Sequence, residues 1–179
     1  RNWRRRMLPG ADVVRDALAT GAHVVLTGRV ADPSLFLGVA LHHHGWSYQD
    51  LPKLAAGTIM GHLLECSAQI TGGYFADPGK KDVPRLAELA YPYADLYGDG
   101  ELYIGKPAGS GGRLDRMTCT EQALYEIHDP AAYVTPDCVL SWKACILRSS
   151  TRTGWPCAAY APRRGPIATR SWSATSMGG

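Results

Sequence analysis

Residues 11–28, ADVVRDALATGAHVVLTG, decide the expected fold because they join a helical pattern to a short apolar run. Apolar residues recur from Val13 to Leu18 at the spacing of one helix face, and Gly21 is suited to end that helix. The apolar run 24–26 then predicts a buried strand. The order of elements is therefore helix, turn and strand.

The segment that follows continues the alternation of strand and helix. Asp32, Pro33 and Ser34 are suited to begin a helix, and residues 35–41 are mostly apolar. Alternation of this kind favours an α/β fold in layers with a mainly parallel sheet. Ligands usually bind such sheets at loops that leave the carboxyl ends of strands. We therefore expect a ligand-binding loop at residues 27–32.

Three further elements complete the expected fold. Pro52 suits the first turn of a long helix that runs to about Ile70. Residues 93–105 read as two strands joined by a Gly-Asp-Gly turn, which is typical of a β-hairpin. Thr118 predicts the N-cap of another helix, which ends before Pro130.

Composition excludes several classes of protein. The chain has 179 residues, which is enough for one domain, and it contains no apolar run of the ~20 residues that cross a bilayer. Its formal net charge of +3 is too small to indicate a nucleic-acid partner. No apolar stretch follows the basic opening residues, so we expect no secretory signal, and the five cysteines include no CxxC pair. We expect a cytoplasmic protein with reduced thiols, no metal site and no membrane partner.

Residues 141–179 differ in kind from the rest of the chain. They contain three tryptophans but no Asp or Glu, and they follow neither helical nor strand periodicity. The tryptophans argue against a disordered extension. Codons can be chosen for residues 151–157 so that the same bases, read in a shifted frame, encode Glu-Asp-Arg-Val-Ala-Val. That peptide resembles ordinary protein sequence. We predict a frameshift near Leu140 in the coding DNA, and poor packing of the residues after it.

Four segments carry a resemblance to a known family. They are GAHVVLTGRVADPSLFL, LAAGTIMGHLLECSAQITGGYFADPGKKDVP, KPAGSGG and EQALYEIHDPAAYVTPD. Together they are similar to the acyclic terpene utilisation family of AtuA-like proteins, over about residues 9–140. The conserved N-terminal domain of that family is longer than this chain. The resemblance therefore implies that residues 9–140 are part of a larger domain. Residues 141–179 are then an anomalous tail.

The resemblance also implies a metabolic role. Family members are associated with the catabolism of acyclic terpenes such as citronellol and geraniol, through CoA thioesters and a biotin-dependent acyl-CoA carboxylase. A CoA thioester or a terpenoid acid is thus the expected ligand, and an acyl-CoA carboxylase is a possible partner. No reaction, cofactor or catalytic residue follows from the resemblance. The alternative is a non-catalytic accessory or scaffold protein that binds the carboxylase.

The predicted loop at the start of the second helix is the first candidate site. It contains Thr27, Gly28, Arg29 and Asp32. Arginine binds carboxylate or phosphate in a bidentate manner, and the helix N-terminus that follows adds donors and positive potential. The alternative is an Arg29–Asp32 salt bridge that only braces the loop. No Walker or GxGxxG motif is present, so a nucleotide is not indicated.

His62, Glu65 and Cys66 lie within one turn of the predicted long helix. His62 and Glu65 form a candidate acid–base pair. A thiolate at Cys66, paired with His62, is a possible nucleophile, but its apolar neighbours favour a place in the core. The three histidines 42–44 point about 100° apart on a helix, so they cannot converge on one metal ion.

The exit of that helix and a later glycine-rich loop supply the remaining candidates. Gly72 and Gly73 permit positive φ and a close approach of a ligand to the backbone. Asp77 is a candidate catalytic residue, with a purely structural Asx turn as the alternative. Lys106 precedes a Gly-Ser-Gly-Gly loop suited to a phosphate or the pyrophosphate of CoA, or simply to the surface. We expect segments 27–32, 62–77 and 106–112 to form one pocket.

Overall fold

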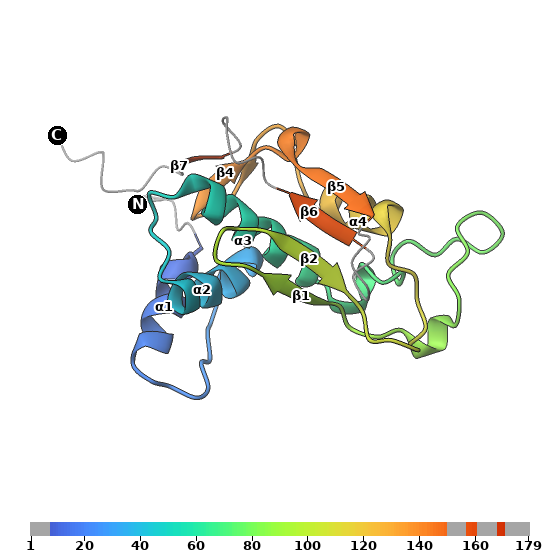
Figure 1. Ribbon diagram of the computed structural model, residues 1–179, viewed down its shortest axis with the longest axis horizontal. Coiled ribbons are helices and arrows are strands. Elements are labelled where there is room, and N and C mark those ends of the chain that lie inside the picture. The colour runs from blue at the N-terminus through green and yellow to red at the C-terminus, as the bar shows by residue number, and fades with distance from the viewer. Residues whose placement is uncertain (1–7, 150–156, 161–167, 171–179) are drawn as a thin grey trace, which may run out of the picture.

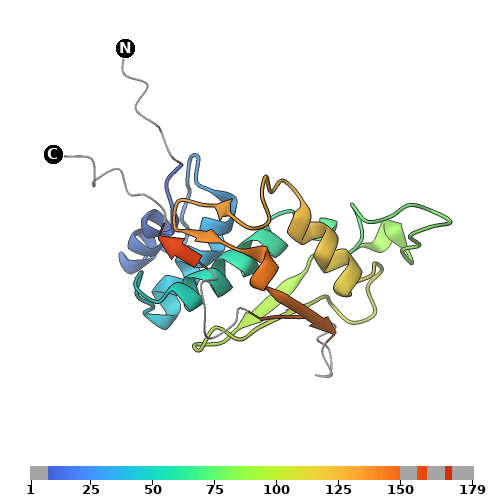
Figure 2. The same ribbon diagram turned by 90° about the horizontal axis from the view of Figure 1, so that it is seen from above.

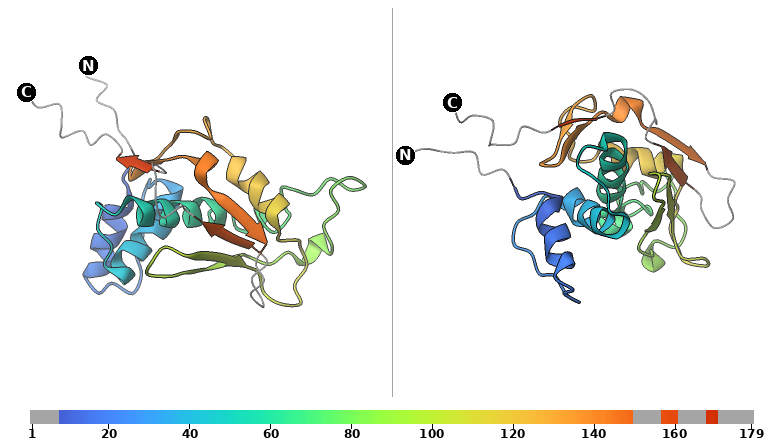
Figure 3. Two further views of the ribbon diagram at one scale, coloured as in Figure 1. Left: turned by 45° about the horizontal axis from the view of Figure 1, so that its top comes forward. Right: turned by 60° about the vertical axis from the view of Figure 1, so that its left-hand side comes forward.

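A long buried helix, α3 (Leu51–Leu64), lies at the centre of the molecule. The computed structural model describes residues 8–149, 157–160 and 168–170. The helix α2 (Asp32–His44) packs against α3, α1 (Ala11–Ala19) packs against α2, and strands lie on other sides of α3 (Figures 1 and 3). Among the described helices, none is long and apolar enough to span a membrane.

The composition of α3 explains its position. Every residue from Leu54 to Leu63 is buried, which is expected of a helix that is apolar on all faces. Glycines allow α2 to approach closely: a methyl group at Gly61 would collide with the backbone of Pro33, and one at Gly57 would lie 2.5 Å from Leu37. The small residues of α3 therefore set how α2 crosses it.

A buried carboxylate fixes the first two helices to a distant part of the chain. The N-cap of α1 is Gly10, which has no side chain to bond the first backbone donors. Asp137 takes that role, since its Oδ1 accepts from the Ala11 amide at 2.8 Å and its Oδ2 accepts from Ser34 Oγ at 2.5 Å. Burial raises the pKa of the Asp137 carboxyl, while these hydrogen bonds oppose the shift.

The described strands form two small sheets. One has the order β1-β2-β6-β5 and the other the order β3-β4-β7. The strands are β1 (Tyr93–Leu96), β2 (Leu102–Gly105), β3 (Tyr133–Val134), β4 (Cys138–Leu140), β5 (Ile146–Ser149), β6 (Cys157–Tyr160) and β7 (Ala168–Arg170). In Figure 2 the smaller sheet lies near α1 and α2, and β5 lies with α4 (Arg116–Leu124) toward the other end of α3.

The expected combination of helices and strands is confirmed, but a mainly parallel sheet is not found. Every strand pair in the described ranges is antiparallel. The predicted strand at residues 24–26 is wrong: this segment is a loop, in which Val24 is 78 % and Leu26 is 93 % exposed. The helices α1 and α2 pack directly against each other, so their connection runs over the surface and has nothing to pair with.

The predicted hairpin and the start of α2 are confirmed. Leu96 pairs with Leu102 across β1 and β2, and the Gly100 amide donates to the Tyr97 carbonyl in the turn between them. Gly100 has a φ of +90°, which explains the glycine in this turn. The second helix begins at Asp32, the first residue of the predicted Asp-Pro-Ser start.

Two predicted helix ends are wrong. The long helix ends at Leu64 and not near Ile70, because the chain then forms a 3₁₀ turn at Ser67–Gln69, where Ser67 has a φ of +52°. At α4 the N-cap is Asp115, which accepts from two backbone amides, and Thr118 completes the capping box from inside the helix. Other 3₁₀ turns are Leu86–Glu88 and Trp142–Ala144.

The described parts of the tail pair with the rest of the domain. The strand β6 pairs with β2 and β5, and β7 pairs with β4. Trp142 is buried, with 8 % of its surface exposed. Residues 150–156, 161–167 and 171–179 lie outside the described ranges. The predicted poor packing of the tail also concerns these residues. The frameshift stays a prediction, because only the DNA can test it.

Candidate functional site

The imidazole of His62 is held in a buried position at the end of α3. His62 is 1 % exposed, and its Nε2 lies 3.1 Å from the backbone carbonyl oxygen of Gln122 in α4. The side-chain amide of Gln122 donates in return to the backbone oxygen of His62, also at 3.1 Å. A carbonyl oxygen only accepts, so Nε2 carries a proton and Nδ1 is the acceptor nitrogen of the neutral ring.

Glu65 faces that acceptor nitrogen. Its Oε1 lies 3.3 Å from His62 Nδ1, in ion-pair range although without the geometry of a hydrogen bond. A neutral imidazole nitrogen and a carboxylate oxygen are both acceptors, and they would repel each other at this distance. A single proton between these two atoms would turn the repulsion into a hydrogen bond. Such a pair has the composition of a general acid–base site.

Aromatic rings shield the pair from water. The ring centroid of Tyr133 lies 5.0 Å from that of His62, and the centroid of Trp142 lies 5.2 Å from it. Burial, and then the nearby Glu65 charge, raises the pKa of the Tyr133 hydroxyl, which therefore stays protonated at neutral pH. The apolar surroundings strengthen electrostatic interactions within the pair.

The pair lines a cavity of about 350 Å³, which we call the His62 cavity. Three carboxylates, from Asp32, Glu65 and Glu126, lie in its wall, and its described lining residues include no Lys or Arg. The other lining residues are Leu8, Ala31, Pro33, Tyr133, Val134, Thr135 and Pro136. This lining favours a neutral or cationic group over a carboxylate or phosphate.

Only part of the predicted pocket comes together. Asp32 reaches the His62 cavity, but the exposed Thr27, Gly28 and Arg29 do not line it. The alternative Arg29–Asp32 salt bridge is not observed in the described part of the chain. Segments 27–32 and 106–112 lie toward opposite ends of the molecule (Figures 1 and 2), so they do not share a pocket.

Cys66 is not placed as a nucleophile. Burial raises the pKa of its thiol, and the adjacent Glu65 charge raises it further, so the thiolate is disfavoured. The imidazole nitrogens of His62 face Gln122 and Glu65. Cys66 is only partly buried and is not among the described residues of the buried core, so its predicted place in the core is not found either.

The glycines at the helix exit are accounted for by contacts within the protein. Gly72 has a φ of +118°, and a methyl group there would lie 2.6 Å from Val83. A methyl group at Gly73 would lie 3.1 Å from the Ala68 carbonyl oxygen. Neither glycine lines the His62 cavity. A role of Gly72 and Gly73 in ligand binding stays a prediction without support from this geometry.

Asp77 and Lys106 also serve their own loops. The backbone of Asp77 exchanges two hydrogen bonds with Lys81, and its exposed carboxylate lies 3.5 Å from Lys80 Nζ. Lys106 Nζ donates to the backbone and side-chain oxygens of Ser110 at 3.0 and 3.1 Å. The turn at Asp77 is thus made by backbone hydrogen bonds and not by the Asx turn named as the alternative, and the Lys106 contacts agree with a loop braced from within.

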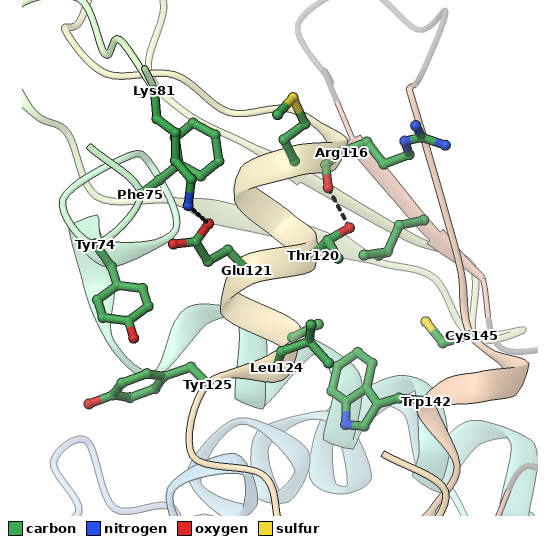
Figure 4. Close-up of a pocket in the computed structure, with 13 residues that line it drawn as sticks. Tyr74, Phe75, Lys81, Arg116, Thr120, Glu121, Leu124, Tyr125, Trp142 and Cys145 are labelled. Atoms are coloured by element: carbon green, nitrogen blue, oxygen red, sulfur yellow. Dashed lines mark hydrogen bonds and ion pairs between the residues drawn. The ribbon is translucent and has the colours of Figure 1, made fainter. Parts of the chain in front are cut away.

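A larger hollow lies over the outer face of α4 (Figure 4), and we call it the α4 groove. It has a volume of about 770 Å³ and runs between the loop of Phe75 and the start of β5. Its lining residues are Tyr74, Phe75, Lys81, Arg116, Met117, Thr120, Glu121, Ala123, Leu124, Tyr125, Trp142, Cys145 and Leu147. Sequence reasoning missed it because its residues come from three separate segments. The one available signal is the pair of apolar residues, Met117 and Leu124, on the exposed face of a polar helix.

Comparison with known families decides the relationship of this chain. The family model described as acyclic terpene utilisation family protein AtuA matches residues 6–152. The chain belongs to the AtuA family. Neither a curated protein nor a solved structure is found to match it. The suspected family is thus confirmed, and its extent passes Leu140, the predicted end of the resemblance.

Both hollows belong to the AtuA part of the chain. Their lining runs from Leu8 to Leu147, entirely within the matched residues. Groups of three or more His, Cys, Asp or Glu that could hold a metal ion are not found among the described residues of this AtuA-family protein.

Proposed function

We propose that this AtuA-family protein is an enzyme of acyclic terpene utilisation that moves a proton on a terpenoid or branched acyl compound in the His62 cavity. The observation that carries the proposal is the buried His62–Glu65 pair, 3.3 Å apart, in the wall of a cavity. Family membership supports a place in acyclic terpene utilisation. Placement of such a pair at a cavity supports acid–base chemistry.

Each member of the pair has a separate part in this proposal. Glu65 Oε2 has no hydrogen-bond partner within the described structure, and Glu65 lines the cavity. Oε2 is itself buried, so the Glu65 carboxylate as a whole, which lines the cavity, is the group placed to take a proton from a substrate or to give one. His62 Nδ1 lies behind Glu65, close to its other oxygen, and accepts or returns that proton. The Gln122 carbonyl holds the imidazole in the required orientation through Nε2.

The charge of the cavity distinguishes between the two ligands expected from the sequence. Its three carboxylates repel the carboxylate of a terpenoid acid. The carbonyl of a CoA thioester is neutral, and the proton on the carbon beside it is acidic enough for a carboxylate base in a water-poor site. A thioester is therefore the favoured substrate, with the phosphates of CoA outside the cavity.

Deuterium exchange tests this proposal. The protein is incubated with a terpenoyl-CoA in D₂O, and incorporation of deuterium beside the thioester carbonyl is followed by mass spectrometry. Glu65→Gln is expected to slow exchange by about 10²-fold or more, the range typical of a lost general base. Glu88→Gln is the matched control, because Glu88 is an exposed acid paired with Arg85. Exchange that is absent with wild type, or equal in Glu65→Gln, contradicts the proposal.

A non-catalytic accessory role beside an acyl-CoA carboxylase is the second candidate. The observation that favours it is a set of exposed apolar side chains on α1, α2 and the loop between them. These are Val13, Val24, Leu26, Leu35 and Val39. Co-purification with the carboxylase that is lost in Leu26→Glu supports this role, while unaltered co-purification argues against this surface as the contact.

A further inference from the structure

We propose that the α4 groove is a second binding site, which takes an amphipathic monocarboxylate with an aliphatic tail. The site differs from the His62 cavity in its lining and its charge, and it requires no catalysis at His62. The proposal depends on three features. The groove has an apolar floor, the charged residues on one of its sides pair with each other, and one arginine has no acidic partner among the described residues.

The apolar floor comes from the outer face of α4 and the start of β5. Met117 and Leu124 are seven residues apart, so they lie on one face of the helix, and they are 51 % and 54 % exposed. The buried Trp142 lies beside Leu124 (Figure 4), and Leu147 of β5 also lines the groove. Large apolar side chains exposed together in a hollow favour an aliphatic ligand.

The side of the groove near Phe75 carries no net charge. Lys81 Nζ donates to Glu121 Oε2 at 2.6 Å and lies 4.8 Å from the centroid of the Phe75 ring. Tyr74 and Tyr125 meet edge to face below this ion pair, with 5.2 Å between their centroids (Figure 4). This side is thus aromatic and internally paired, and it does not select a charged ligand.

Arg116 supplies the remaining charge. Its side chain extends on the β5 side of α4 (Figure 4), and no ion pair of Arg116 is found in the described residues. As the first residue of α4 it opposes the positive end of the helix dipole, so its position does not serve helix stability. An arginine recognises a carboxylate in bidentate fashion.

These features fix the class of ligand. Lys81 and Glu121 cancel, which leaves the positive charge of Arg116 as the net charge of the described lining residues. One arginine matches one carboxylate, whereas the several phosphates of a CoA would require more cations. A volume of about 770 Å³ falls within the range of small-molecule sites, most of which are largely apolar. The site therefore suits a carboxylic acid whose tail lies against Leu124 and Leu147.

Calorimetric titration with octanoate and 1-octanol tests the site, because the two probes share a tail and differ in charge. Octanoate is expected to bind wild type more tightly than octanol. Arg116→Gln is expected to weaken octanoate about tenfold and to leave octanol within about twofold, since a charge-assisted contact is lost. Leu124→Glu weakens both probes. Leu86→Glu, at a side chain that is 42 % exposed in the 3₁₀ turn Leu86–Glu88 and outside the groove, is the matched control and changes neither.

Two results overturn the proposal. One is an octanoate titration of wild type that shows no binding at millimolar concentration. The other is an Arg116→Gln variant, folded by circular dichroism, that binds octanoate as wild type does. His62→Gln keeps octanoate binding if the two sites are separate, so failure of the proton-transfer function is distinguished from failure of the groove.

Discussion

Replacing Asp137 by alanine removes the carboxylate that holds α1 and α2 to the loop before β4. Two buried donors, the Ala11 amide and Ser34 Oγ, then lose their acceptor. Each unpaired buried donor costs about 1–3 kcal/mol, so the free energy of unfolding is expected to fall by about 3 kcal/mol. For a chain of this size the melting temperature is then lower by ~6–12 °C. Asp95→Ala, at an exposed position of β1, is the control.

The Asp137→Asn variant separates the charge from the geometry. The amide oxygen still accepts from Ala11, but the buried negative charge is gone. Because burial raises the pKa of Asp137 above 3.8, the folded state keeps its proton to higher pH than the unfolded chain does. Wild type must therefore lose stability relative to Asp137→Asn as the pH rises through and above 3.8.

Urea unfolding from pH 3.5 to 7 measures this difference directly. The expected result is a free energy of unfolding that falls in wild type relative to Asp137→Asn over the lower part of that range. A wild type that gains stability relative to the asparagine variant as the pH rises would refute the reasoning. So would an Asp137→Ala variant that melts with the Asp95→Ala control.

Two further predictions concern α3 and its exit. Gly61→Ala is expected to lower the free energy of unfolding by about 1–3 kcal/mol, because the added methyl collides with the Pro33 backbone; thermal melts that match wild type would contradict this. Cys66 is expected to react with iodoacetamide more slowly than a free thiol at pH 7, because burial raises its pKa, and rapid alkylation mapped to Cys66 by mass spectrometry would contradict this.

The sequence predicts local features of this fold well where the chemistry is local. The Gly-Asp-Gly turn specifies the β1–β2 hairpin, because its glycine at position 100 adopts a positive φ. The Asp-Pro-Ser start specifies α2. Three apolar residues at 24–26 do not specify a strand, since a run this short fits a surface loop equally well. With that strand gone, the argument for a mainly parallel sheet has no basis.

The candidate site divides in the same way. The spacing of His62 and Glu65 along one helix was sufficient to predict their proximity. The imidazole is oriented by Gln122 and shielded by Tyr133 and Trp142. These residues come from segments far along the chain, and no local pattern connects them to His62. Their part in the site depends on tertiary packing.

The protonation of the His62 ring tests the central claim most directly. Nitrogen NMR of the labelled protein distinguishes a protonated from an unprotonated ring nitrogen. The Gln122 carbonyl predicts that Nε2 is the protonated nitrogen of the neutral ring, with Nδ1 unprotonated beside Glu65. A neutral His62 ring protonated at Nδ1 and bare at Nε2 would contradict the acid–base pair.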